Sequence, residues 1–113
     1  MVLDDFRLDN KVAIVTGAGT GLGQGLAIGL AEAGADIVAT YNTHRPDALE
    51  GELDRIGRKM LAVKADLRTT QPIQGIIDSA VSHFGRLDIL VNNAGTIFRA
   101  PALEYPEDRW DEV

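Results

Sequence analysis

The feature that most constrains the fold is a glycine-rich segment, Thr16-Gly17-Ala18-Gly19-Thr20-Gly21-Leu22-Gly23. It directly follows an apolar run at residues 12–15 and leads at once into a helical pattern, which Leu22, Leu26 and Leu30 line and which ends near Gly34. Glycine at such a position permits positive φ angles and close approach of the backbone to a neighbour. The segment therefore predicts a strand, a tight turn and a helix in immediate succession.

Apolar runs alternate with helical patterns along the rest of the chain. Strands are expected at residues 12–15, 37–39, 60–63 and 87–91, and their near-continuous hydrophobicity is typical of parallel strands buried on both faces. A helix is expected over residues 73–84, between Pro72 and Gly85, and another from Leu49 to Ile56, ending at Gly57.

This alternation predicts an α/β fold with a doubly wound parallel sheet, because the crossovers between parallel strands are right-handed. The expected strand order is 3-2-1-4. Residues 106–113 read as the start of a further helix, and a domain ending there would leave the fourth strand as an open apolar edge. We therefore expect a truncated sheet.

Composition excludes several classes of function. The chain has 11 basic and 17 acidic residues, a net charge of -6 that disfavours nucleic acid and anionic membranes. It has no cysteine, and its two histidines, His44 and His83, lie far apart, so no metal site is expected. The N-terminus is acidic, and no apolar run approaches the roughly 20 residues of a membrane span. We expect a cytoplasmic protein.

The glycine-rich segment is also a candidate anion site, because N–H groups at a helix N-terminus face phosphates. Residues 16–23 fit T-G-x-x-x-G-x-G; they do not fit G-x-G-x-x-G, and they lack the Lys and Ser or Thr of a P-loop. A glycine-rich turn without a ligand is the alternative. Gly25 and Gly29 each cost the following helix roughly 1 kcal/mol against alanine, which favours close packing or close ligand approach there.

Two further polar segments follow expected strands. Asn92-Asn93-Ala94-Gly95 comes after the fourth strand and Asp66-Leu67 after the third, at the carboxyl edge where open α/β sheets bind ligands. Small polar residues there can hydrogen-bond backbone and ribose, and the Asp66 carboxylate can accept from an adenine amino group. Ordinary turns, with Asp66 capping one of them, are the alternative.

Together, residues 15–23, 65–67 and 87–95 resemble the short-chain dehydrogenase/reductase family, in motif order and spacing, over essentially the whole chain. The resemblance implies a Rossmann-like fold and NAD(P)-dependent interconversion of a secondary alcohol and a ketone. Residues 20–25, 65–68 and 110–113 are most similar to the 2-deoxy-D-gluconate 3-dehydrogenases, with the gluconate 5-dehydrogenases next. This implies a sugar-acid substrate, NAD as cofactor and a homo-oligomeric full-length protein.

The resemblance also implies roles for individual residues. The glycine segment would lie along the pyrophosphate and ribose, Asp66 and Leu67 would flank adenine, and Asn93, Ala94 and Gly95 would border the nicotinamide-side ribose, while Asn92 would bridge neighbouring strands. The expected cofactor-binding residues are Gly17, Thr20, Gly21, Leu22, Gly23, Asn42, Asp66, Leu67, Asn93, Ala94 and Gly95.

The end of the second strand departs from the usual NAD pattern. An acidic residue usually holds the adenosine ribose there, or an arginine meets the 2'-phosphate of NADP. Here Tyr41 stands in place of the acid, Asn42 can hydrogen-bond the ribose, and Arg45 either meets a 2'-phosphate or is solvated. NADP therefore stays open as an alternative to NAD.

The family's catalytic Asn, Ser and Tyr-x-x-x-Lys have no counterpart in this sequence. We therefore expect residues 1–113 to be the N-terminal NAD(P)-binding half of a single Rossmann domain, incomplete at the C-terminus and inactive alone; a non-catalytic dinucleotide-binding module is the alternative. Arg99 follows the Asn-Asn-Ala-Gly turn and is expected to pair with a substrate carboxylate, the alternative being a solvated loop arginine.

Overall fold

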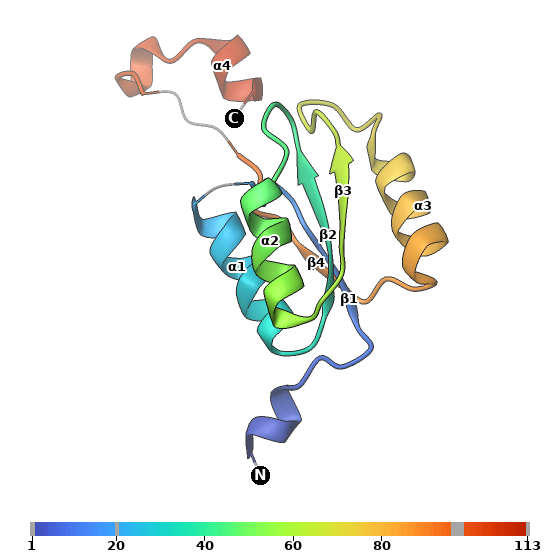
Figure 1. The fold of residues 1–113 in the computed structure, drawn as a ribbon. Coiled ribbons are helices and arrows are strands. Elements are labelled where there is room, and N and C mark those ends of the chain that lie inside the picture. Colours follow the sequence, from blue (N-terminus) through green and yellow to red (C-terminus); the bar gives the residue numbers. More distant parts are fainter. Residues whose placement is uncertain (1, 20, 96–98, 113) are drawn as a thin grey trace.

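The four predicted strands form one parallel sheet in a computed structural model that describes residues 2–19, 21–95 and 99–112. Its order, β3-β2-β1-β4, confirms the predicted 3-2-1-4 (Figure 1). The strands are β1 (Val12–Val15), β2 (Asp36–Tyr41), β3 (Met60–Lys64) and β4 (Ile89–Val91). The run at residues 87–91 is a strand only over its last three residues, and β2 extends two residues beyond the predicted Ala39.

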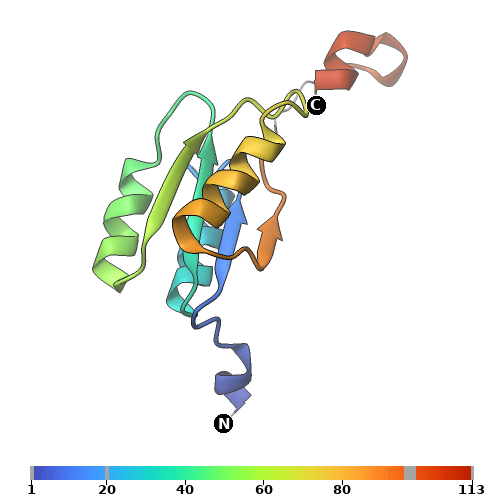
Figure 2. The same cartoon turned by 90° about the vertical axis from the view of Figure 1, so that its right-hand side faces the viewer.

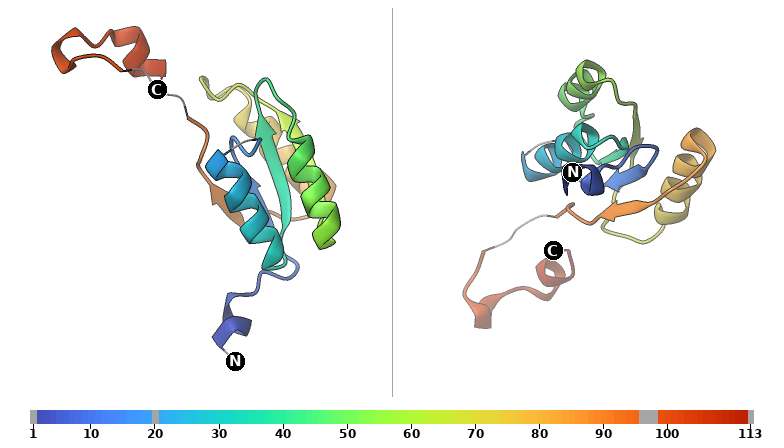
Figure 3. Two further views of the ribbon diagram at one scale, coloured as in Figure 1. Left: turned by 60° about the vertical axis from the view of Figure 1, so that its left-hand side comes forward. Right: turned by 90° about the horizontal axis from the view of Figure 1, so that it is seen from below.

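Helices cover both faces of the sheet, as the doubly wound fold requires. α1 (Gly21–Glu32) and α2 (Asp47–Ile56) lie on one face and α3 (Ile73–Phe84) on the other, which is clearest from below in Figure 3. Gly57 and Gly85 end α2 and α3 in the left-handed conformation, with φ of 89° and 81°. A side chain is disfavoured at such φ, which is why glycine marked these helix ends in the sequence.

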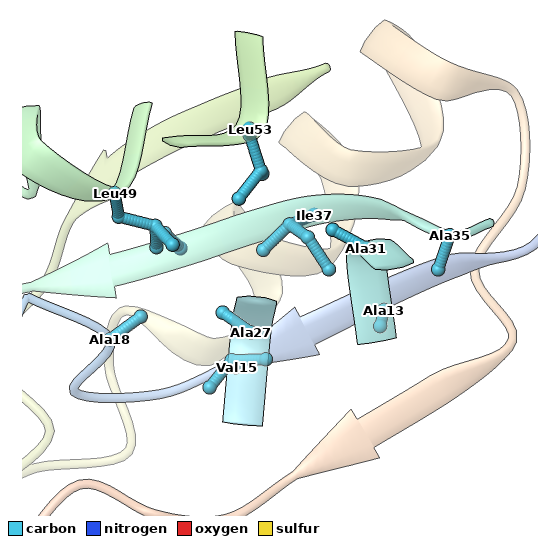
Figure 4. Close-up of a cluster of buried hydrophobic side chains, with 10 residues drawn as sticks. Ala13, Val15, Ala18, Ala27, Ala31, Ala35, Ile37, Leu49 and Leu53 are labelled. Atoms are coloured by element: carbon cyan, nitrogen blue, oxygen red, sulfur yellow. The ribbon is translucent and has the colours of Figure 1, made fainter. Parts of the chain in front are cut away.

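The core lies between the sheet and the helices. Alternate strand residues point to opposite faces, so Ala13, Val15 and Ile37 face α1 and α2, whereas Val12 and Ile14 face α3. Figure 4 shows Leu49 and Leu53 of α2 reaching down onto Ile37. Both leucines are fully buried, and each such burial contributes roughly 1.5–3 kcal/mol.

Two small side chains of α1 allow that helix to lie close to the sheet. Ala27 and Ala31 are buried against β1 and β2, and their size leaves little distance between helix backbone and strand. The N-terminus of α1 therefore has a fixed position above the end of β1, and this places the glycine segment.

A carboxylate fixes the amino end of the sheet. Oδ2 of Asp88 accepts a hydrogen bond from the N–H of Val12 (2.9 Å), and the backbone N–H of Asp88 donates to the Val12 carbonyl (3.0 Å). The guanidinium of Arg86 also binds the carboxylate (2.6 Å). The Arg86 hydrogen bonds, and then that of Val12, lower the pKa of Asp88 from 3.8 to about 2.

Several apolar side chains remain exposed around the sheet edge. Leu90 of β4 is 59% exposed, and Ile73, Ile77 and Val81 form an exposed stripe on α3. α4 (Glu107–Glu112), which follows the short 3-10 helix Ala102–Glu104, lies apart from the sheet (Figure 2). No helix within the described ranges is long and apolar enough to cross a bilayer.

Candidate functional site

The loops after β1 and β4 are joined into one unit by Thr16 and Asn93. The buried hydroxyl of Thr16 accepts the backbone N–H groups of Asn93 and Ala94, both at 2.9 Å, and donates to the carbonyl of Val91 (3.3 Å). The side-chain amide of Asn93 donates to the carbonyls of Thr16 (3.1 Å) and Gly17 (3.2 Å). We call this set of hydrogen bonds the Thr16–Asn93 clasp.

The clasp gives Asn93 the bridging role that was expected of Asn92. Asn92 was expected to bridge neighbouring strands, but the side chain that does so is that of Asn93. The side-chain N–H groups of Asn93 therefore bind the protein backbone. A ligand could contact Asn93 only through atoms that take no part in these hydrogen bonds.

Two glycines of the segment are required by the packing of the protein itself. Gly17 has a φ of 64°, and a Cβ built there would lie 2.9 Å from the Cα of Ala94. A Cβ on Gly23 would overlap the carbonyl oxygen of Gly17 and the amide nitrogen of Asn93. Without side chains at these positions, the start of α1 can rest directly on the clasp.

Gly21 differs from these two because it faces open space. Its φ of 55° is in the left-handed region, and, chain neighbours and the backbone of its own helix aside, no atom of the described residues lies within 4 Å of a Cβ built there. Its backbone conformation favours glycine, and the described residues leave the space of a side chain free beside it.

Gly25 and Gly29 were expected to mark close packing or close ligand approach. Close packing within the chain is wrong as an explanation, since no atom of the described residues lies within 4 Å of a Cβ built at either position. Both glycines are exposed on α1, on the same side as Leu22, which is 74% exposed. Close approach of a ligand to Gly25 and Gly29 stays a prediction.

A cavity of about 390 Å³ opens beside the clasp at the carboxyl edge of the sheet. Its size falls within the range of small-molecule sites. Six of the eleven expected cofactor-binding residues line it: Gly17, Asn42, Asp66, Leu67, Ala94 and Gly95. The other lining residues are Thr40, Tyr41, Ala65 and Arg68.

The remaining expected residues that the structure describes lie outside the cavity lining. Gly21, Leu22 and Gly23 form the first turn of α1, next to the glycine loop. Thr20 lies outside the described residues. Arg99 is exposed, and no hydrogen bond or ion pair joins its side chain to another described residue. The structure thus gathers the motif residues from three strand ends and leaves Arg99 apart.

Asp66 carries an ion pair inside the cavity that the sequence analysis missed. Its carboxylate binds Nη2 (2.7 Å) and Nε (3.1 Å) of Arg68 and accepts the Arg68 backbone N–H (3.0 Å). These hydrogen bonds, the side-chain ones first, lower the pKa of Asp66 from 3.8 to about 2. The signal for this pair was available, since an arginine follows the Asp-Leu motif directly.

Thr40 is a second residue that the sequence analysis missed. It is buried near the end of β2, where its hydroxyl accepts the N–H of Gly17 (3.3 Å) and its carbonyl accepts that of Ala18 (3.3 Å). The glycine loop is therefore held from β2 as well as from β4.

Arg45 is exposed and is not among the residues that line the cavity. Its guanidinium binds both carboxylate oxygens of Glu50, at 3.2 and 3.1 Å, and also binds the carboxylate of Asp47. These hydrogen bonds, those to Glu50 first, raise the pKa of Arg45 above its ordinary value. Both acids belong to the first turn of α2.

The arrangement suits an elongated anionic ligand. The first turn of α1 has N–H groups without intrahelical partners, and their partial positive charge favours phosphate. The neighbouring cavity offers carboxylate, amide, hydroxyl and apolar groups along the ends of β2 and β3. In open α/β sheets a crevice at this place, beside a change in strand order, is where ligands bind.

Comparison with known proteins agrees with this architecture. A family model described as short chain dehydrogenase matches residues 11–113. The chain is 50% identical over 113 residues to 2-dehydro-3-deoxy-D-gluconate 5-dehydrogenase of Escherichia coli K12 and 45% identical to the enzyme of that name from Dickeya dadantii. In both cases the alignment covers all of this chain and 44% of the relative.

Solved structures give the same result at the level of the fold. A dehydrogenase/reductase from Sinorhizobium meliloti 1021 superposes with a TM-score of 0.91 at 35% identity, over 98% of this chain and 45% of that one. A short chain dehydrogenase from Burkholderia cenocepacia J2315, solved in complex with NADP, gives a TM-score of 0.87 at 34% identity, over 94% and 44%. The chain thus spans less than half the length of the relatives it matches, and by family match, identity and fold it belongs to the short-chain dehydrogenases.

Proposed function

We propose that the crevice binds NAD and that residues 1–113 are the N-terminal NAD(P)-binding half of a single Rossmann domain. The observation that carries the proposal is the contrast among the glycines of the segment. Atoms of the clasp fill the space where a side chain of Gly17 or Gly23 would lie. At Gly21, by contrast, the described residues leave that space open at the N-terminus of α1. A pyrophosphate fits such a place, since it needs N–H donors and a backbone that it can approach closely.

The rest of the cofactor would follow the cavity lining. Asn42 is proposed to hydrogen-bond the adenosine ribose, and Asp66 with Leu67 to flank adenine. Ala94 and Gly95 are proposed to border the nicotinamide-side ribose through their backbone groups. Asn93 acts in this proposal by holding the glycine loop in shape through the clasp.

The proposed reaction is oxidation of a secondary alcohol to a ketone on a sugar acid, or the reverse. When bound, NAD supplies the hydride acceptor. The sequence resemblance favoured 2-deoxy-D-gluconate as substrate; the names of the relatives favour 2-dehydro-3-deoxy-D-gluconate, oxidised at carbon 5, and we propose this second substrate. Arg99 is proposed to pair with the substrate carboxylate, for which its planar guanidinium is well suited.

Catalysis is proposed to need residues that this sequence does not carry, because it has no Tyr-x-x-x-Lys to exchange the proton of the alcohol. Residues 1–113 alone are accordingly expected to bind NAD without turnover. For the complete enzyme we propose a cytoplasmic homo-oligomer that binds neither nucleic acid nor membrane.

The test uses Gly21→Val and Gly57→Val in the full chain. Both glycines have positive φ and open space where a side chain would lie, so both variants carry a similar backbone strain. Gly57 ends α2 just before β3 begins, far from the carboxyl ends of the strands where the cavity opens. Calorimetric titration with NAD should show binding to the wild type and to Gly57→Val, and none to Gly21→Val.

Thermal unfolding of both variants by circular dichroism serves as the control for folding. Equal NAD affinity in the wild type and Gly21→Val would show that the pyrophosphate does not approach this glycine. A wild-type chain that binds no NAD would overturn the proposal.

A further inference from the structure

Arg45 lies beside the proposed adenosine end of the crevice. Asn42, three residues earlier, lines the cavity, and the carbonyl oxygen of His44 would lie 3.2 Å from a Cβ built on Gly19. The loop that carries Arg45 therefore touches the glycine loop. An arginine at this place normally meets the 2'-phosphate of NADP.

In this chain the guanidinium of Arg45 is already bound. Glu50 engages it with two parallel hydrogen bonds, at 3.2 and 3.1 Å, and Asp47 binds it as a second carboxylate. Two acids against one arginine leave a net charge of about -1 at this position. The other arginine near the crevice, Arg68, is bound by Asp66 in the same bidentate manner.

The helix that carries the two acids is packed onto the sheet. They belong to the first turn of α2, whose Leu49 and Leu53 are fully buried against the sheet. Pro46, which precedes the helix, is also fully buried and anchors the loop. Arg45 is therefore bound by side chains of a helix that the core of the domain keeps in place.

We propose that Asp47 and Glu50 make the crevice selective for NAD over NADP, by binding Arg45 and leaving negative charge beside the adenosine ribose. The proposal rests on the proposed function. A ribose with two free hydroxyls is neutral and tolerates this charge, whereas a 2'-phosphate carries up to two negative charges and is repelled. The acid missing from the end of β2 at Tyr41 is thus replaced by two acids, six and nine residues further along the chain.

The test compares the binding of ADP and 2',5'-ADP to the full chain by calorimetry. These ligands need only the adenosine half of the site. In the double variant Asp47→Asn, Glu50→Gln the affinity for 2',5'-ADP relative to ADP should rise by about fivefold to tenfold, the effect of one or two partly screened charge contacts. Adding Arg45→Met to this double variant should reduce the rise, because the site then has no net charge instead of the positive charge of Arg45.

The matched control is Glu52→Gln. Glu52 also pairs with an arginine on α2, Arg55, and its removal changes the net charge without touching Arg45. The relative affinity should stay at the wild-type value in this variant. Because both ligands are titrated into the same preparation, a modest loss of stability affects them equally.

The outcomes separate the two proposals. If the wild type binds neither ADP nor NAD, the proposed function fails and this inference fails with it. If the wild type binds ADP but the double variant shows no relative gain for 2',5'-ADP, the inference alone is overturned. A gain that equals that of Glu52→Gln, or that is undiminished when Arg45→Met is added, also overturns it.

Discussion

The tight packing around the candidate site predicts opposite effects for two substitutions in one helix. Gly23 and Gly25 are two residues apart near the start of α1. A Cβ on Gly23 would overlap the Gly17 carbonyl and the Asn93 amide, whereas a Cβ on Gly25 meets nothing within 4 Å. Gly23→Ala should therefore destabilise the chain, and Gly25→Ala should stabilise it.

The magnitudes follow from this geometry. Replacing glycine by alanine inside a helix gains about 1 kcal/mol in either case. At Gly23 this gain is outweighed by overpacking of about 1–3 kcal/mol and by weakening of the two Asn93 hydrogen bonds, worth about 1 kcal/mol each. We expect Gly23→Ala to lower the free energy of unfolding by about 2 kcal/mol and Gly25→Ala to raise it by about 1 kcal/mol.

The assay is urea and thermal denaturation of the full chain, both followed by circular dichroism. For a domain of this size the two melting temperatures should differ by roughly 12 °C, about 8 °C below and 4 °C above the wild type. If the unfolding free energies of the two variants agree within about 0.5 kcal/mol, a typical surface effect, then the start of α1 does not rest on the clasp and the reasoning fails.

Two further predictions concern groups that join distant parts of the chain. Thr16→Val leaves two backbone N–H groups without their acceptor and should lower the free energy of unfolding by about 2–4 kcal/mol, measured by urea denaturation. Thr16→Ser keeps the hydroxyl and should lower it by less than about 1.5 kcal/mol. Equal losses in the two variants would mean that the hydroxyl is unimportant. Because the folded pKa of Asp88 is lowered from 3.8 to about 2, its contribution to stability is complete above pH 3.8 and is lost as the pH falls towards 2. The urea midpoint should therefore drop over this interval in the wild type and less steeply in Asp88→Asn, and parallel profiles would contradict the assignment.

The fold could be predicted because each of its determinants is local. Four apolar runs separated by helical patterns permit few arrangements once crossovers are right-handed, so the order 3-2-1-4 is confirmed. The ends of α2 and α3 were marked by Gly57 and Gly85, which adopt the left-handed conformation that glycine favours. The motif residues that line the cavity were found for a similar reason, since they directly follow strands.

The errors concern the directions of side chains. Asn93 bridges the two loops in place of Asn92, because the register of β4, with Val91 opposite Val15, decides which asparagine faces Thr16, and neighbouring residues point to opposite sides. The ion pairs of Arg45 depend on flexible side chains that reach across a turn, and no apolar pattern records them. The Arg68 pair was marked only by the position of that arginine directly after the Asp-Leu motif. Thr40 was missed because β2 extends beyond the run at residues 37–39.

The central place of β1 in the sheet has a consequence for the order of folding during synthesis. β1 is made first, and β2 and β3 can pair beside it as soon as residue 64 is available. The other side of β1 must wait for β4, and Asn93 meets Thr16 across 77 residues of chain. Long-range pairings of this kind form slowly, because the intervening loop must close first. The glycine loop therefore acquires its final shape late, and a nascent chain has most of its core before it has a crevice.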